Sequence, residues 1–139
     1  MSEAIAVYNQ TTGAIERVKN VHASINDYVT HPMSSAAANV ATNLTQVGVA
    51  GKSWYVSYVN WRVSGTAAVG AANLALTVKD GDTTIYASAI PSGSTNGTNL
   101  AIIFTQPIKI TAGNAVTYAI ATPGAVGCII YANLGLFQR

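Results

Sequence analysis

The stretch NLALTVKDGDTTIYASAI, residues 73–90, decides the fold class, because apolar and polar residues alternate on both sides of Asp80-Gly81-Asp82. A glycine beside aspartate between two alternating runs is a strong signal for a tight hairpin turn. Side chains of a strand alternate with a period of two, so a turn with an even residue count places both apolar rows on one face. We therefore predict an antiparallel hairpin that turns at Asp80-Gly81 or Gly81-Asp82. Its two apolar rows are Leu74, Leu76 and Val78, then Ile85, Ala87 and Ala89.

Outward from this hairpin, the chain from residue 52 onward shows further strands separated by turn signals. Turn-forming residues occur at 91–99, at Gly113-Asn114 and at Thr122-Pro123-Gly124. Pro107 interrupts the apolar run before Gly113, and because proline cannot donate to a β-ladder, it predicts an edge position or a bend. Roughly seven strands with turns every ~8–12 residues are typical of a β-sandwich or barrel. No internal repeat or linker divides this part of the chain.

Two of the predicted strands carry bulky residues on both faces. The stretch 53–63 has Trp54, Val56 and Tyr58 on one face, and Tyr55, Val59, Trp61 and Val63 on the other. The stretch 126–137 has Cys128, Ile130, Leu134 and Leu136 on one face, and Ile129, Tyr131 and Phe137 on the other. A strand with one solvated face alternates cleanly between apolar and polar residues. We therefore expect both faces of these strands to be covered, one by the core and one by the N-terminal segment or another subunit.

Residues 1–50 differ in pattern from residues 51–139, and we predict an N-terminal arm followed by a sandwich domain. Two alternatives are open for the first part of the arm. A short amphipathic helix is indicated by apolar residues at helical spacing, Ile15, Val18, Val21, Ile25 and Val29. A hairpin is indicated by Ile5 to Asn9 and Ala14 to Val18 around Thr12-Gly13. Pro32 is expected to end this part, and residues 34–47 then form a helix or an extended arm.

Composition limits the classes of function. Only 9% of the 139 residues are charged, against about a quarter in an ordinary soluble protein, so we expect part of the surface to be buried in an assembly. The seven basic residues are scattered along the chain, which disfavours nucleic acid as a ligand. We find no signal peptide and no apolar run long enough for a membrane helix, and the single cysteine excludes an intrachain disulfide.

Candidate catalytic and metal-binding residues are few. The only histidines are His22 and His31, and Cys128 lies in an apolar stretch as a core thiol would. Asp80 and Asp82 occupy a turn, where little burial is available to raise a carboxyl pKa for acid catalysis, and no third acid is near enough for calcium. We predict no catalytic residues, no metal and no cofactor. The possible interface residues are the aromatics Trp54, Tyr55, Tyr58 and Trp61, for which core and subunit packing is favoured over stacking on sugar rings.

Residues 52–139 resemble small tailed-phage virion proteins that fold as one β-sandwich or jelly-roll domain. The resemblance is carried by the extended–DG–extended hairpin, by Phe-x-x-Pro-Ile at 104–108, by Ala-Gly-Asn-Ala-Val at 112–116, and by the hydrophobic closing strand. These motifs are turn chemistry and contain no active-site pattern. The first fifty residues resemble no family.

The resemblance implies an all-β antiparallel jelly-roll sandwich and a non-enzymatic virion protein, foremost a capsid decoration (cement) protein. It also implies assembly in the host cytoplasm, a homotrimer, and contact with the major capsid protein or other virion proteins. An arm at the N-terminus would reach a neighbouring subunit. The alternatives are a tail, baseplate or fibre component, or a carbohydrate-binding module of the same sandwich class.

Overall fold

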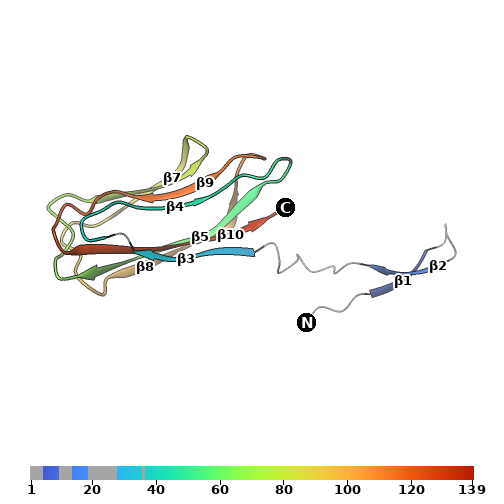
Figure 1. Ribbon diagram of the computed structural model, residues 1–139, viewed down its shortest axis with the longest axis horizontal. Helices are drawn as coiled ribbons and strands as arrows, with labels where there is room; N and C mark the ends of the chain where they lie inside the picture. Colours follow the sequence, from blue (N-terminus) through green and yellow to red (C-terminus); the bar gives the residue numbers. More distant parts are fainter. Residues whose placement is uncertain (1–4, 10–13, 19–27, 36) are drawn as a thin grey trace.

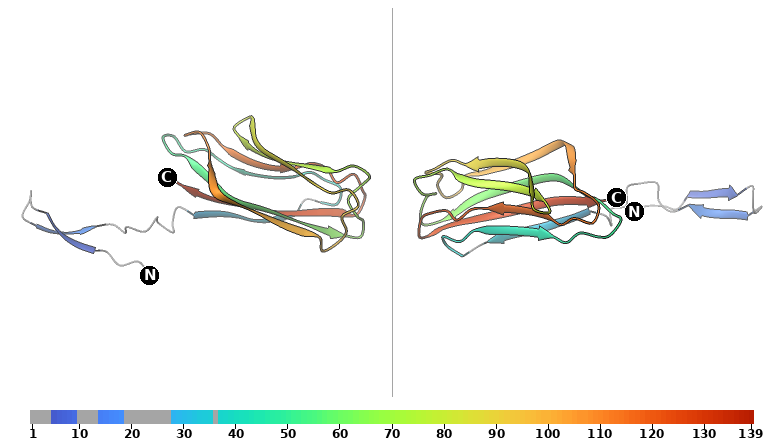
Figure 2. Two further views of the ribbon diagram at one scale, coloured as in Figure 1. Left: turned by 180° about the vertical axis from the view of Figure 1, so that it is seen from behind. Right: turned by 90° about the horizontal axis from the view of Figure 1, so that it is seen from above.

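The computed structural model describes residues 5–9, 14–18, 28–35 and 37–139, and it describes side chains from residue 37 onward. Two four-stranded antiparallel sheets are stacked face to face, and a separate two-stranded sheet lies beyond one end of them (Figures 1 and 2). The strands are β1 (Ile5–Asn9), β2 (Ala14–Val18), β3 (Tyr28–Ser35), β4 (Thr42–Gln46), β5 (Trp54–Gly65), β6 (Leu74–Asp80), β7 (Thr83–Ile90), β8 (Asn99–Lys109), β9 (Val116–Ile120) and β10 (Cys128–Gln138).

The strand order defines a jelly roll. One sheet has the order β3-β10-β5-β8 and the other has β4-β9-β6-β7. The first strand of the sandwich pairs with the last, the second with the second last, and so inward to the β6–β7 hairpin. Eight strands wound in this nested way into two sheets form a jelly roll. The predicted all-β antiparallel sandwich is confirmed. Residues after 52 supply six of its strands rather than about seven, and β3 and β4 complete the eight.

The core lies between the two sheets and is made by alternate residues of their inner faces. The fully buried side chains include Leu76, Ile130 and Leu134. Among the side chains described from residue 37 onward, two hydrogen bonds cross the core from one sheet to the other. The Tyr118 hydroxyl donates to the Asn60 carbonyl at 3.2 Å, and the Thr42 hydroxyl donates to the Ile130 carbonyl at 3.0 Å. These bonds allow two polar side chains to be buried at low cost.

The central hairpin is present, but its second apolar row differs from the prediction. Gly81 and Asp82 form a two-residue turn, and Gly81 has a φ of 57°, which glycine adopts without strain. Val78 pairs with Tyr86 and Lys79 pairs with Thr84, so Ile85 is an extra residue in a β-bulge. The row opposite Leu74, Leu76 and Val78 is therefore Ile90, Ser88 and Tyr86. The expected row is wrong for Ala87 and Ala89, which are exposed, because one inserted residue moves every later side chain to the other face. Ile85, at the bulge itself, is partly buried and packs against the core.

A second bulge corrects the predicted faces of β5. Gly135 pairs with Tyr58 and Leu136 pairs with Val56, so Ser57 is the extra residue. The expected grouping of Tyr58 with Trp54, and of Tyr55 with Trp61, is wrong for this reason. The core side holds Trp54, Val56, Val59, Trp61 and Val63, and the outer side holds Tyr55 and Tyr58. The faces predicted for β10 are correct, since Cys128, Ile130, Leu134 and Leu136 are all buried.

In the N-terminal part, the hairpin alternative is the one found. β1 pairs with β2 from Ile5↔Val18 to Asn9↔Ala14. The helical alternative is wrong for the described residues, because none of them is helical and Ile15 and Val18 lie in β2. Val21 and Ile25, and the turn at Thr12-Gly13, lie outside the described residues.

Residues 28–46 contribute one strand to each sheet. Pro32, expected to end the N-terminal part, lies inside β3, at the edge of its sheet and between the pairs Leu134↔His31 and Ala132↔Ser34, where the register shifts. An edge bulge tolerates proline because no ladder donor is needed there. Pro107 similarly lies in the edge strand β8, as predicted. The segment expected as a helix or arm holds β4 instead. The predicted division into an arm of residues 1–50 and a sandwich domain of residues 51–139 stays a prediction, although β3 and β4 pair within the two sheets. Within the described residues, no helix is long and apolar enough to cross a bilayer.

Candidate interaction surface on the sheet β3-β10-β5-β8

The side of the sheet β3-β10-β5-β8 that faces away from the core is here named the outer face. Its side chains alternate along each strand with the buried ones, and the strand register sets them in rows across β10, β5 and β8. The successive rows are Phe137–Tyr55–Lys109, Gly135–Tyr58–Ile103, Asn133–Asn60–Ala101 and Tyr131–Arg62–Asn99. One half of this face is therefore mainly aromatic and apolar, with Lys109 at its end, and the other half is mainly polar, with Tyr131 beside Arg62.

The apolar half is held in place by ring contacts. The rings of Tyr55 and Phe137 are stacked, with centroids 5.0 Å apart and planes 4° from parallel. The ring of Tyr58 covers Gly135, where a side-chain carbon would overlap it. Beside Tyr58, Ile103 is 74% exposed. This half presents rigid aromatic area, which loses little entropy when a partner covers it.

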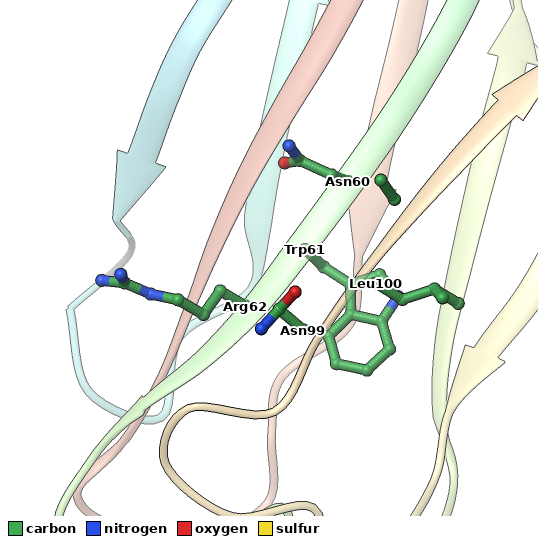
Figure 3. A pocket seen from close by; sticks show the side chains of 6 residues that line it. Asn60, Trp61, Arg62, Asn99 and Leu100 are labelled. Carbon is green, nitrogen blue, oxygen red and sulfur yellow. The ribbon is translucent and has the colours of Figure 1, made fainter.

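The polar half is organised around Arg62. Its guanidinium lies over the Tyr131 ring, 4.9 Å from the centroid, a distance typical of a cation–π contact. Next to it, β5 and β8 enclose a hollow of about 170 Å³ that is lined by Asn60, Trp61, Arg62, Asn99, Leu100 and Ala101. Figure 3 shows the side chains of Asn60, Arg62 and Asn99 on one side of β5, and those of Trp61 and Leu100 on the other.

Charge on the outer face has one sign among the side chains described from residue 37 onward. Arg62 and Lys109 lie on it, and the Arg139 guanidinium is 5.3 Å from the centroid of the Phe137 ring. The acidic side chains of this range, Asp80 and Asp82, lie at the β6–β7 turn of the other sheet. The outer face is thus suited to a partner that carries negative charge.

The four aromatic residues proposed from the sequence lie on different sides of β5. Trp54 and Trp61 are each only 4% exposed and belong to the core. The Trp54 indole N–H donates to the Val47 carbonyl at 3.0 Å, whereas the buried Trp61 indole N–H has no partner among the described groups. Tyr55 and Tyr58 lie on the outer face. A contact role for these two tyrosines stays a prediction.

Sequence reasoning missed Arg62, Asn60 and Ile103 as members of the same surface. The alternation that would have grouped Tyr58 with Asn60 and Arg62 was visible from Tyr58 onward. It was obscured because the pattern was continued from Trp54 through the bulge at Ser57. Ile103 could not be placed without knowing which strand pairs with β5.

The carboxylates at the turn have a structural role. Asp80 accepts hydrogen bonds from the Thr111 backbone N–H at 3.0 Å, the Thr111 hydroxyl at 2.7 Å and the Asn114 amide at 2.8 Å. Slight burial acts to raise the pKa of Asp80, but the three hydrogen bonds outweigh it and hold the pKa below its ordinary value. This carboxylate ties the end of β6 to the loop before β9.

The other candidate groups show no catalytic arrangement within the described part. Cys128 is buried, and desolvation raises the pKa of its thiol, which opposes formation of a nucleophilic thiolate. Among the described residues, no three His, Cys, Asp or Glu side chains lie close enough to hold a metal ion. The side chains of His22 and His31 lie outside the described part.

Comparison with solved structures finds partial likeness. The chain is similar to PRD1 vertex protein P5, with 19% identity, 81% of this chain and 97% of that chain covered, and a TM-score of 0.49. It is also similar to the insecticidal delta-endotoxin Cry8Ea1 from Bacillus thuringiensis, with 10% identity, 81% and 19% covered, and a TM-score of 0.39. A chain of infectious bursal disease virus, Gx strain, has 13% identity, 100% and 37% covered, and a TM-score of 0.33.

These likenesses carry no conclusion about function, since every identity is below 25% and every TM-score is below 0.5. This chain also spans well under half of the endotoxin and virus chains. No family model matches the sequence. No curated protein matches it either.

Proposed function

We propose that this chain is a non-enzymatic structural protein of a virus particle, and more specifically a capsid decoration protein that binds and stabilises the shell. The observation that carries the proposal is the outer face. Its partly exposed aromatic side chains form an ordered array beside Ile103, which is exposed. Exposed apolar patches on a soluble domain mark contact sites.

The composition supports the same role. With only 9% charged residues, the chain has a surface suited to being covered by neighbours rather than to standing alone in water. The resemblance of residues 52–139 to small tailed-phage virion proteins points the same way. The partners we propose are other copies of this chain, as a homotrimer, and the major capsid protein. The place of action is the virion, assembled in the host cytoplasm.

The separate hairpin β1–β2 supports the proposal of an N-terminal arm that contacts a neighbouring subunit. In the described structure it pairs only with itself and stands apart from the sandwich (Figure 1). An isolated two-stranded hairpin is marginally stable in water. We therefore expect it to become ordered against a neighbouring subunit in the particle.

A carbohydrate-binding module is disfavoured by the contacts of the rings. The Tyr131 ring is covered by Arg62, and Phe137 is stacked on Tyr55 and contacted by Arg139. These faces are occupied by the protein's own groups, so a sugar ring would have to displace them. The chemistry of the outer face does not distinguish a capsid position from a tail, baseplate or fibre position, so location within the particle has to be measured.

The first test compares two lysine substitutions on exposed edge strands. Ile103→Lys adds a charge to the outer face of β8, and Ala87→Lys adds the same charge to β7 of the other sheet. We expect light scattering after size exclusion to show a trimer for the natural chain and for Ala87→Lys, and a smaller species for Ile103→Lys. Urea unfolding of each variant checks that the fold is retained. Equal mass for all three proteins would contradict a contact role for the outer face.

The second test concerns the particle itself. We expect the chain to sediment with density-gradient-purified virus particles from the cells that produce it, and immunogold labelling to mark the shell. Label on tails or fibres would replace the capsid assignment by the tail or fibre alternative. Absence from the particles, together with saturable binding of a neutral glycan, would contradict the proposed function and favour the carbohydrate-binding alternative.

A further inference from the structure

The hollow between β5 and β8 is lined by three residues with hydrogen-bonding side chains, and the Arg62 guanidinium lies beside it, over the Tyr131 ring of β10. Asn60 and Arg62 come from β5, and Asn99 lies directly opposite Arg62 on β8. The hollow exists because the residue opposite Asn60 is Ala101, whose methyl group leaves space that a longer side chain would fill. Figure 3 shows the three side chains on the same side of β5, with the Arg62 guanidinium extending away from Asn99.

The donors in this hollow are largely unused. The Arg62 guanidinium has no ion pair with any side chain from residue 37 onward, and its contact within that range is the face of the Tyr131 ring. A cation–π contact fixes the plane of the guanidinium and leaves its N–H edges able to donate. The side-chain amide of Asn60 makes no hydrogen bond to a described group. The Asn99 amide donates one bond, to the Gly97 carbonyl at 3.0 Å, and retains a second N–H.

We propose that this hollow binds the carboxylate of an aspartate or glutamate side chain in an extended segment of a partner protein. The guanidinium fork matches the two carboxylate oxygens, and Asn60 and Asn99 add amide donors at the sides. Among the side chains described from residue 37 onward, the charged groups of the outer face are positive, since Arg62 and Lys109 lie on it and Asp80 and Asp82 lie on the other sheet, which favours an acidic partner.

The surface next to the hollow selects a peptide over a small anion or a sugar acid. The row beside Asn60 holds Tyr58 and the exposed Ile103. A segment whose carboxylate enters the hollow therefore places its neighbouring apolar side chains on this half of the face. The Tyr131 ring, which a sugar would need for stacking, is already covered by Arg62. The inference rests on the proposed contact role of the outer face and names the chemistry of the partner.

The test uses the full chain labelled with ¹⁵N and two capped peptides, Glu-Leu-Glu-Leu and its neutral analogue Gln-Leu-Gln-Leu. We expect the glutamate peptide to shift the side-chain N–H signals of Asn60, Arg62 and Asn99 in a saturable way, and the glutamine peptide to leave them in place. Arg62→Gln should weaken the binding about tenfold, the effect of losing one charge-assisted contact. Lys79→Gln, which removes an equal charge from β6 of the other sheet, should leave it unchanged.

Several outcomes would overturn the carboxylate site. Equal chemical-shift changes with both peptides would show that the site does not recognise the carboxylate charge. Equal losses of peptide affinity in Arg62→Gln and Lys79→Gln would show only a general effect of net charge. Glucuronate binding in the hollow without peptide binding would replace the peptide by a sugar acid. If neither peptide binds while Ile103→Lys still dissociates the assembly, the carboxylate site fails and the proposed function stands.

Discussion

Gly135 makes room for the ring of Tyr58, and replacing it with alanine tests how rigidly the outer face is built. The two residues lie directly opposite each other on β10 and β5. A Cβ at position 135 would overlap Cε1 and Cδ1 of Tyr58 and lie 2.7 Å from its Cζ. The φ of Gly135 is not in the left-handed region, so alanine suits the backbone. The Tyr58 ring is the group that opposes the substitution.

The effect of Gly135→Ala on the free energy of unfolding is compared in the natural chain and in the Tyr58→Ala variant. In the natural chain, Gly135→Ala inserts a methyl group into a closed contact and should lower the free energy of unfolding by about 1–3 kcal/mol. In a Tyr58→Ala background the ring is gone, and the same change should raise the free energy of unfolding by about 0.4–1 kcal/mol, because alanine restricts the unfolded chain. The coupling free energy between the two positions is then about 1.4–4 kcal/mol.

The assay is equilibrium unfolding in urea, monitored by the fluorescence of Trp54 and Trp61. Each indole is only 4% exposed in the folded chain, so unfolding changes its environment strongly. The reasoning is refuted if Gly135→Ala has the same effect with and without the tyrosine ring. In that case Tyr58 would already move freely and would not be an ordered element of the contact surface.

Three further predictions concern groups away from the outer face. Tyr118→Phe removes the hydrogen bond to the Asn60 carbonyl that joins the two sheets, and should lower the free energy of unfolding in urea by about 0.5–1.5 kcal/mol; no change would mean that this bond is not needed. Slight burial raises the pKa of Asp80, but hydrogen bonds from Thr111 and Asn114 outweigh it, so the folded-state pKa is lowered. Ionised Asp80 therefore stabilises the fold above the unfolded pKa of about 3.9. This contribution is lost as the pH falls through the lower folded pKa. Asp80→Asn should therefore reduce the dependence of the urea midpoint on pH in this acid range, and an unchanged dependence would contradict the assignment. The Cys128 thiol is buried and its pKa is raised, so Ellman's reagent should react with it only in urea; fast reaction in buffer would show that this end of the core opens readily.

The sequence predicted the elements that depend on local chemistry. The Asp-Gly-Asp turn predicted the β6–β7 hairpin because glycine at a left-handed position is a local requirement of the turn. The buried face of β10 was predicted correctly because the period of two holds along this strand from Cys128 to Leu136, without an inserted residue. Pro107 indicated an edge strand for a reason that also needs no knowledge of the partner strand.

The errors arose where pairing between distant strands decides the geometry. The bulges at Ser57 and Ile85 each add one residue against the partner strand and reverse all later faces. Neither residue type signals a bulge by itself. For the same reason, the sequence grouped two core tryptophans with two outer tyrosines. It could not join Ile103 to Tyr58, since their proximity follows from the β5–β8 register.

The nested pairing of the strands also determines the order in which the molecule can fold. Only β6 and β7 are joined by a two-residue turn, whereas β3 and β10 come from opposite ends of the sandwich sequence. The entropy cost of pairing β5 with β8, β4 with β9 or β3 with β10 falls once the pair nested inside it has formed, because the unstructured loop that must be closed is then shorter. Folding should therefore begin with the β6–β7 hairpin and continue through the pairs β5–β8, β4–β9 and β3–β10 in turn. Every intermediate would expose unpaired strands to neighbouring chains until β3 and β10 meet.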